Sequence, residues 1–168
     1  MKQGIKIAID LMGGENSPEK NLEGANLFLK RNKNINDCFF YFFGNENEII
    51  KKIANYKHLN NKYKIFHTDI VVSDEASALS TIKKGKNSSM WNSIQSQIDQ
   101  DTDVTLSAGN TGVLLVMSKM ILKTLDNVDK PALAGLWPNK KNMNVVLDLG
   151  ANVECSEKNL IDFSEMGS

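Results

Sequence analysis

Val104-Thr-Leu-Ser107-Ala-Gly-Asn-Thr-Gly112-Val-Leu-Leu-Val-Met117 is the most informative stretch of this 168-residue chain. It begins with a short apolar run typical of a strand, continues with a turn of small residues, and ends in an apolar helix-forming run. Gly109 and Gly112 allow the backbone to approach a ligand closely, and Asn110 and Thr111 are favoured helix caps. A helix that begins here directs free N–H groups and partial positive charge toward the turn. Two interpretations stay open, an anion-binding loop and a plain strand-to-helix turn.

The rest of the chain alternates short apolar runs with longer amphipathic stretches. This alternation predicts an α/β fold, a three-layer α/β/α sandwich around a mainly parallel, Rossmann-like sheet. We expect strands at residues 5–9, 39–43, 64–67, 103–106, 132–136 and 144–149. We expect helices at residues 17–30, 46–55, 74–83, 88–97 and 111–123, and a closing helix from residue 156.

Two of the expected helix starts can be described more closely. Ser17 is a favoured cap, and Pro18 suits the first helical position. Ser156 is also a favoured cap, but Asn159 stands three residues later, where a capping box has Glu or Gln. We therefore expect no capping box at the closing helix.

Composition argues against several classes of protein. Twenty basic and twenty acidic residues give a formal net charge of zero, which disfavours a nucleic-acid binder. Cys38 and Cys155 are too few for a disulfide framework, as expected in a reducing cytoplasm. The N-terminus is too soon charged for a signal peptide, and no apolar run approaches the ~20 residues of a membrane span. We expect residues 1–168 to form one soluble, cytoplasmic domain.

Three segments at expected strand ends combine glycine with carboxylate, amide or hydroxyl groups. They are Asp10-Leu-Met-Gly-Gly-Glu15, Ser107–Gly112 and Asp148-Leu-Gly-Ala-Asn152. Because ligands bind outside the carboxyl ends of parallel strands, we expect all three on one rim, lining an anion pocket. The candidate phosphate- and substrate-binding residues are Asp10, Gly13, Gly14, Ser88, Ser107, Gly109, Asn110, Thr111, Gly112, Asp148 and Asn152.

The roles of several candidates stay open. Asp10 and Asp148 either contribute to the site or only orient a loop or a lysine. Ser88 is either a helix cap or a further anion contact, and Lys84 and Lys86 are the nearest cations by sequence. The usual dinucleotide, P-loop and hydrolase motifs are absent, and neither histidine has a metal-ligand neighbour. We therefore expect no cofactor and no metal.

Taken together, the segments resemble the bacterial phosphate acyltransferase family known as PlsX. The matching strings occur in the family's order along the whole chain. They are Ile7-Ala-Ile-Asp10, Met12-Gly-Gly14, Glu23-Gly-Ala25, Ser88-Ser-Met90, Ser107–Gly112, Pro131-Ala-Leu-Ala134, Asp148, Gly150-Ala-Asn-Val153 and Met166-Gly-Ser168.

The resemblance implies a fold related to phosphotransacetylases and isopropylmalate dehydrogenases. It also implies transfer of a fatty acyl group from acyl carrier protein to inorganic phosphate, giving acyl phosphate for phospholipid synthesis. Family members are typically homodimers with peripheral membrane association and no nucleic-acid partner. They are about twice as long, so we expect this chain to correspond to their N-terminal half, with the main catalytic groups partly in the other half and their identity open. The alternatives are an inactive or partner-dependent fragment and a phosphotransacetylase acting on acyl-coenzyme A.

Overall fold

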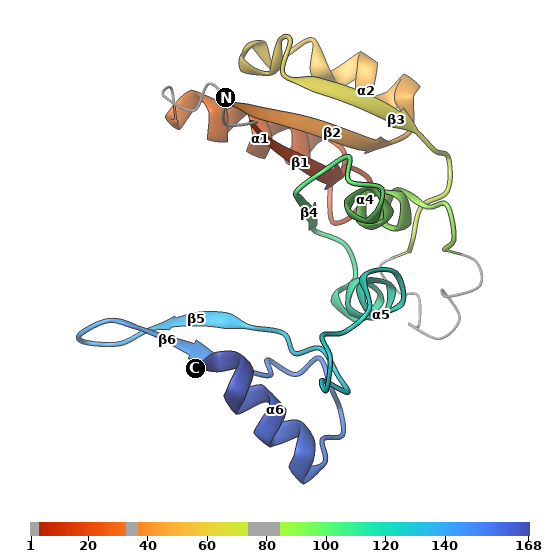
Figure 1. The fold of residues 1–168 in the computed structure, drawn as a ribbon. Helices are drawn as coiled ribbons and strands as arrows, with labels where there is room; N and C mark the ends of the chain where they lie inside the picture. The colour runs from red at the N-terminus through yellow and green to blue at the C-terminus, as the bar shows by residue number, and fades with distance from the viewer. Residues whose placement is uncertain (1–3, 33–36, 74–84) are drawn as a thin grey trace.

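The centre of the molecule is a sheet of four parallel strands. The computed structural model describes residues 4–32, 37–73 and 85–168. The strands are β1 (Ile5–Asp10), β2 (Cys38–Gly44), β3 (Tyr63–His67) and β4 (Val104–Ser107), in the order β3-β2-β1-β4 (Figure 1). The predicted α/β class and parallel sheet are confirmed. The helix expected at residues 74–83 lies outside the described residues.

Helices cover both faces of this sheet. On one face α1 (Glu19–Arg31) and α2 (Glu46–Ile53) pack against Phe40 and Phe42 of β2. On the other face α4 (Ser89–Ile98) lies against β1, β2 and β4, and α5 (Thr111–Leu122) packs on α4. Strand side chains such as Phe40 and Phe42 enter the core under α1 and α2, and a second core cluster lies between α4 and α5. A short 3₁₀ helix, η1 (Lys57–Leu59), precedes β3.

The strand register positions the candidate site. β1 is a central strand, paired with β2 on one side and β4 on the other. Asp10, the last residue of β1, is directly opposite Ser107, the last residue of β4. The loops that follow these two strands therefore leave the sheet side by side at its carboxyl edge.

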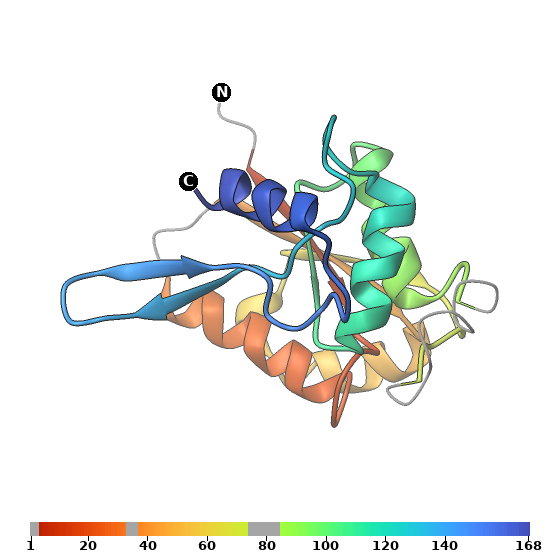
Figure 2. The same cartoon turned by 90° about the horizontal axis from the view of Figure 1, so that it is seen from below.

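The last two strands differ from the prediction. β5 (Gly135–Pro138) and β6 (Met143–Val146) form a separate antiparallel pair, not an extension of the parallel sheet (Figures 1 and 2). The physical reason is the connection, because a parallel crossover needs about a dozen residues. Here Asn139 donates its backbone N–H to the Asn142 carbonyl at 2.8 Å, which closes a tight hairpin. The hairpin leads to α6 (Glu157–Gly167).

Both detailed expectations for helix starts were wrong. Pro18, not Ser17, is the N-cap of α1, and the Ser17 hydroxyl instead donates to the Met12 carbonyl at 2.9 Å. At α6 a capping box is present: the Asn159 side chain accepts from the Ser156 N–H at 3.0 Å, and Ser156 accepts in return from the Asn159 N–H. The shorter Asn side chain reaches back as Glu or Gln does.

The apolar helix expected at residues 111–123 is α5. Val113, Met117 and Ile121 are buried in one core cluster with Met90 and Ile94 of α4. Its remaining apolar side chains are only partly covered. In the part of the chain that the structure describes, no helix is long and apolar enough to cross a membrane.

Candidate functional site

A buried carboxylate organises the carboxyl edge of the sheet. Asp10 is 1% exposed, and the Ser107 hydroxyl donates to its Oδ2 at 2.7 Å. The Ser107 oxygen in turn accepts from the Gly109 backbone N–H at 3.1 Å. Because its proton is directed to Asp10, Ser107 links the carboxylate to the turn and is not placed to donate to a ligand.

Burial sets the ionisation of Asp10. Desolvation raises the pKa of this carboxyl above its ordinary value. Hydrogen bonds from Ser89 and Ser107, and from the N–H groups of Met12 and Gly13, oppose that rise without cancelling it. Asp10 therefore ties the first turn of α4 to the ends of β1 and β4.

Glycines allow the first two loops to touch. A Cβ on Gly13 would lie 2.6 Å from the Asp10 Oδ2 and 2.8 Å from the Gly109 nitrogen. Gly14 has a φ of +87°, which other residues rarely adopt, and a Cβ there would lie 2.7 Å from the Ala108 carbonyl oxygen. Two of the three predicted loops are therefore packed together on one rim.

The start of α5 supplies the hydrogen-bond donors of this rim. Asn110 is the N-cap, and its side chain accepts from the Val113 N–H at 3.0 Å. Thr111 and Gly112 are the first two helical residues, so their N–H groups have no acceptor within the helix. Together with the helix dipole, they can bind an anionic oxygen at this end.

The start of α4 is arranged differently. Ser88 is completely buried and caps the helix by accepting from the Trp91 N–H at 3.1 Å. Ser89, also buried, is the residue that bonds Asp10. The helix-cap interpretation of Ser88 therefore accounts for its contacts, and Ser89 connects the start of α4 to Asp10.

The third predicted loop does not follow a strand of the parallel sheet. Asp148 and Asn152 follow the β5–β6 hairpin and not a strand of the parallel sheet, so the expectation of three loops on one rim was wrong. Asp148 accepts from the N–H groups of Leu133 and Asn152, each at 2.7 Å, and Asn152 donates its amide to the Pro131 carbonyl at 2.8 Å. These bonds join residues 131–133 to residues 148–152.

The ionisation of Asp148 agrees with this role. Burial by itself raises the pKa of the carboxyl, but the hydrogen bonds from Asn152 and Leu133 outweigh it and hold the pKa below its ordinary value. The loop therefore binds the ionised form of the Asp148 side chain. Its stabilising contribution is present above the ordinary Asp pKa and is lost as the pH falls through the lowered value.

We expect Asp148→Ala to lower the free energy of unfolding by about 1–2 kcal/mol at neutral pH, because two loop N–H groups lose a charged acceptor at a partly solvated site. Urea unfolding at pH 7 and pH 3 measures this. The difference between wild type and variant should shrink at pH 3, and a difference unchanged by pH would contradict the assignment.

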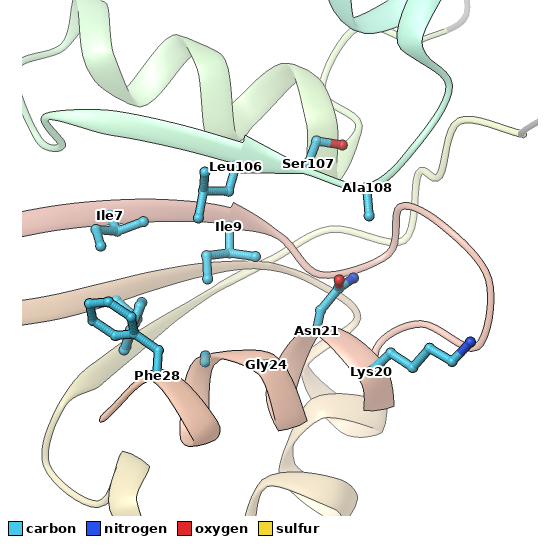
Figure 3. Close-up of a pocket in the computed structure, with 11 residues that line it drawn as sticks. Ile7, Ile9, Lys20, Asn21, Gly24, Phe28, Leu106, Ser107 and Ala108 are labelled. Atoms are coloured by element: carbon cyan, nitrogen blue, oxygen red, sulfur yellow. The ribbon is translucent and has the colours of Figure 1, made fainter. Parts of the chain in front are cut away.

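A cleft runs from this rim along the sheet. It has a volume of about 360 Å³ and lies between α1 and strands β1 and β4 (Figure 3). Lys20 and Asn21 are at its rim end, and Ile7 and Phe28 are at the other. Of the cations expected near the site, Lys86 is exposed before α4, whereas Lys84 lies outside the described residues.

With this geometry in view, comparison with known proteins identifies the family. The model of the family described as "Fatty acid synthesis protein" matches residues 5–168. The chain belongs to this family. The resemblance to phosphate acyltransferases inferred from the motifs is confirmed by its relatives.

Curated members of the family have a consistent name. The chain is 53% identical to the phosphate acyltransferase of Pelagibacter ubique, across 100% of this chain and 49% of the relative. It is 38% identical to the phosphate acyltransferase of Rhodospirillum rubrum, across 99% of this chain and 47% of the relative. The chain therefore spans about half the length of the curated relatives that it matches.

Two residues of the site, Ser89 and Asn21, were not among the candidates predicted from the sequence. Ser89 was quoted only as part of a motif, although its place after a capping serine directs it toward the sheet. Asn21 donates its side-chain amide to the carbonyls of Leu11 and Gly13, at 3.1 and 3.0 Å, and so holds the first loop against α1. An Asn inside an otherwise amphipathic helix was the available signal, because Asn favours such backbone contacts.

Proposed function

We propose that this chain provides the phosphate-binding part of an acyltransferase that moves a fatty acyl group from acyl carrier protein to inorganic phosphate. The names of its relatives support the reaction class. The observation that carries the proposal is the rim itself, where the first turn of α5 presents free N–H groups beside the Asp10–Ser107 pair. The proposed phosphate contacts are Thr111 and Gly112, and Gly13, Gly14, Gly109 and Asn110 hold the loops around them.

The proposed reaction needs no covalent enzyme intermediate. A phosphate oxygen attacks the carbonyl carbon of the thioester, a carbon–oxygen bond forms, and the carbon–sulfur bond breaks. The electron pair leaves on sulfur, the sulfur takes up the proton that hydrogen phosphate gives up, and acyl phosphate and the free thiol of the carrier result. Because phosphate is already ionised, the protein has to position it and to stabilise the oxyanion that develops on the carbonyl. Backbone N–H groups at the start of a helix are suited to positioning the phosphate.

Phosphate should stabilise the folded chain. At a phosphate concentration ten times the dissociation constant, binding contributes about 1.4 kcal/mol, which corresponds to a rise of about 3–6 °C in melting temperature. Differential scanning fluorimetry with phosphate, against chloride at equal ionic strength, measures the effect. The same melting temperature in both salts would contradict phosphate binding.

The reaction is tested with the chain and the remaining half of the Pelagibacter ubique relative. Palmitoyl-acyl carrier protein should lose its thioester only when phosphate is present, with acyl phosphate trapped as a hydroxamate. An unchanged thioester would favour an inactive or partner-dependent fragment. Equal or faster turnover of palmitoyl-coenzyme A would favour a phosphotransacetylase.

The assembly of the protein is also a proposal. Leu136, Trp137, Leu160 and Ile161 of the C-terminal hairpin and α6 are each more than half exposed. Apolar side chains gathered in this way are typical of a surface that a partner covers. They support a homodimer or association with the missing half, in the cytoplasm and peripherally at the membrane. Analytical ultracentrifugation of the chain distinguishes a monomer from a dimer.

A further inference from the structure

The cleft beside α1 changes character along its length. Asn21 and the Ser107–Ala108 turn lie at the rim end, where Lys20 also lines the cleft with its side chain directed outward (Figure 3). The other end is formed by Ile7 and Phe28, and Ile9 and Leu106 lie between the two ends. A polar end at the candidate anion site and an apolar body is the pattern expected for a ligand with a polar head and an apolar tail.

We propose that this cleft holds the fatty acyl chain of the thioester donor, with the carbonyl at the Ser107–Ala108 end and the chain directed along β1 and β4 toward Phe28. This assignment rests on the proposed function. It names the subsite that selects a long-chain substrate.

The floor of the cleft suits an acyl chain better than a polar occupant. The backbone groups of β1 and β4 are paired with each other from Ile7–Val104 to Asp10–Ser107. Between these two strands the floor offers side chains such as Ile9 and Leu106 and not backbone groups, whereas the outer edge of β4 has no neighbouring strand in the described residues. An acyl chain has no polar groups to satisfy, whereas a polar ligand would lose its hydration without compensation.

Gly24 gives the cleft its depth. It lies within α1, where glycine is unfavourable compared with alanine, so its presence calls for a reason. A Cβ built on Gly24 meets no heavy atom within 4 Å, and the residue lines the cleft. A side chain added at this position would therefore start in open space beside the cleft. The phosphate site does not explain the Glu23-Gly-Ala25 string. Its glycine has a role if it keeps space open in the cleft.

The test compares Gly24→Leu with Glu23→Leu, which adds the same side chain to an exposed neighbour outside the cleft. Palmitate is the probe, and its binding to the 168-residue chain is measured by isothermal titration calorimetry. Gly24→Leu should weaken palmitate binding by about tenfold or more, because losing the burial of about two methylenes has this effect. Glu23→Leu should bind as the wild type does. The melting temperature of Gly24→Leu should not fall, which separates a blocked cleft from a damaged fold.

Three results would overturn the assignment. The first is a wild-type chain that does not bind palmitate, and the second is equal palmitate affinity in wild type and Gly24→Leu. The third is displacement of palmitate by the remaining half of the relative, which would mean that polypeptide occupies the cleft.

The proposed function is tested separately by acyl phosphate formation. If palmitate binds as expected but no acyl phosphate forms, the reaction is wrong and the cleft assignment stands. If palmitoyl and acetyl donors react in the same ratio with wild type and Gly24→Leu, the cleft assignment fails and the reaction stands.

Discussion

Replacing Gly13 with alanine is expected to lower the free energy of unfolding by roughly 2–3 kcal/mol, near the upper end for an overpacked site. The new Cβ would lie 2.8 Å from the Gly109 backbone nitrogen and 2.6 Å from the buried Asp10 carboxylate. The Gly109 nitrogen is backbone, and the Asp10 carboxylate is buried and held by Ser107, so the two loops must separate. Urea unfolding measures the loss, and the phosphate-dependent rise in melting temperature should disappear with it.

Gly24→Ala is the matched control, because it is the same substitution at a glycine with open space around it. It should leave stability unchanged or raise it by up to about 1 kcal/mol, since alanine is favoured over glycine within a helix. If Gly13→Ala were as stable as Gly24→Ala and still responded to phosphate, the close contact between the two loops would not be required for the site.

Asp10→Ala is the second substitution with a large expected effect. It removes the acceptor of the Ser107 hydroxyl and of the Met12 N–H from a buried position. Leaving such donors without a partner should lower the free energy of unfolding by roughly 2–4 kcal/mol at pH 5. The Ser107–Gly109 turn should also lose its fixed geometry, and with it the response to phosphate.

The pH dependence of this effect has a definite sign. Because the pKa of Asp10 is raised in the folded protein, its ionisation favours the unfolded state. The contribution of Asp10 to stability is complete below the ordinary pKa of 3.8 and declines as the pH rises through the raised value. The difference between wild type and Asp10→Ala should therefore be largest below pH 3.8 and shrink as the pH rises from 3.8 to 8. A difference that grows over this range would show that the ionised form is the stabilised one.

Local patterns predicted the part of the fold that local chemistry controls. The strand, turn and helix around residues 104–117 are present, and Asn110 caps α5 as expected. The shared rim of the first two loops followed from the rule that parallel strands end at one edge, and the pairing of Asp10 with Ser107 confirms it. The pattern could not show that the Ser107 hydroxyl donates a hydrogen bond to Asp10, because this contact depends on the register between strands far apart in the sequence.

The errors arose where a long-range rule was applied to a short connection. Asn139 and Asn142 close a hairpin, so the last two strands pair antiparallel with each other, and Asp148 follows this pair and not a strand of the parallel sheet. The connection between these two strands is too short for a parallel crossover, and this could be read from the sequence. Ser89 and Asn21 were missed for a different reason: their importance comes from partners in β1 and its loop, which composition and spacing do not reveal.

The central claim is that the start of α5, held by the Asp10–Ser107 pair, binds phosphate. The most direct measurement is a titration of the isotope-labelled chain with inorganic phosphate, followed by amide resonances in two-dimensional NMR spectra. The account predicts saturable shifts concentrated at Gly109, Thr111 and Gly112, with little change at Asn152 or in the β5–β6 hairpin, and none of these shifts with chloride at equal ionic strength. Shifts that are absent, or that are as large at residues 148–152 as at residues 109–112, would contradict it.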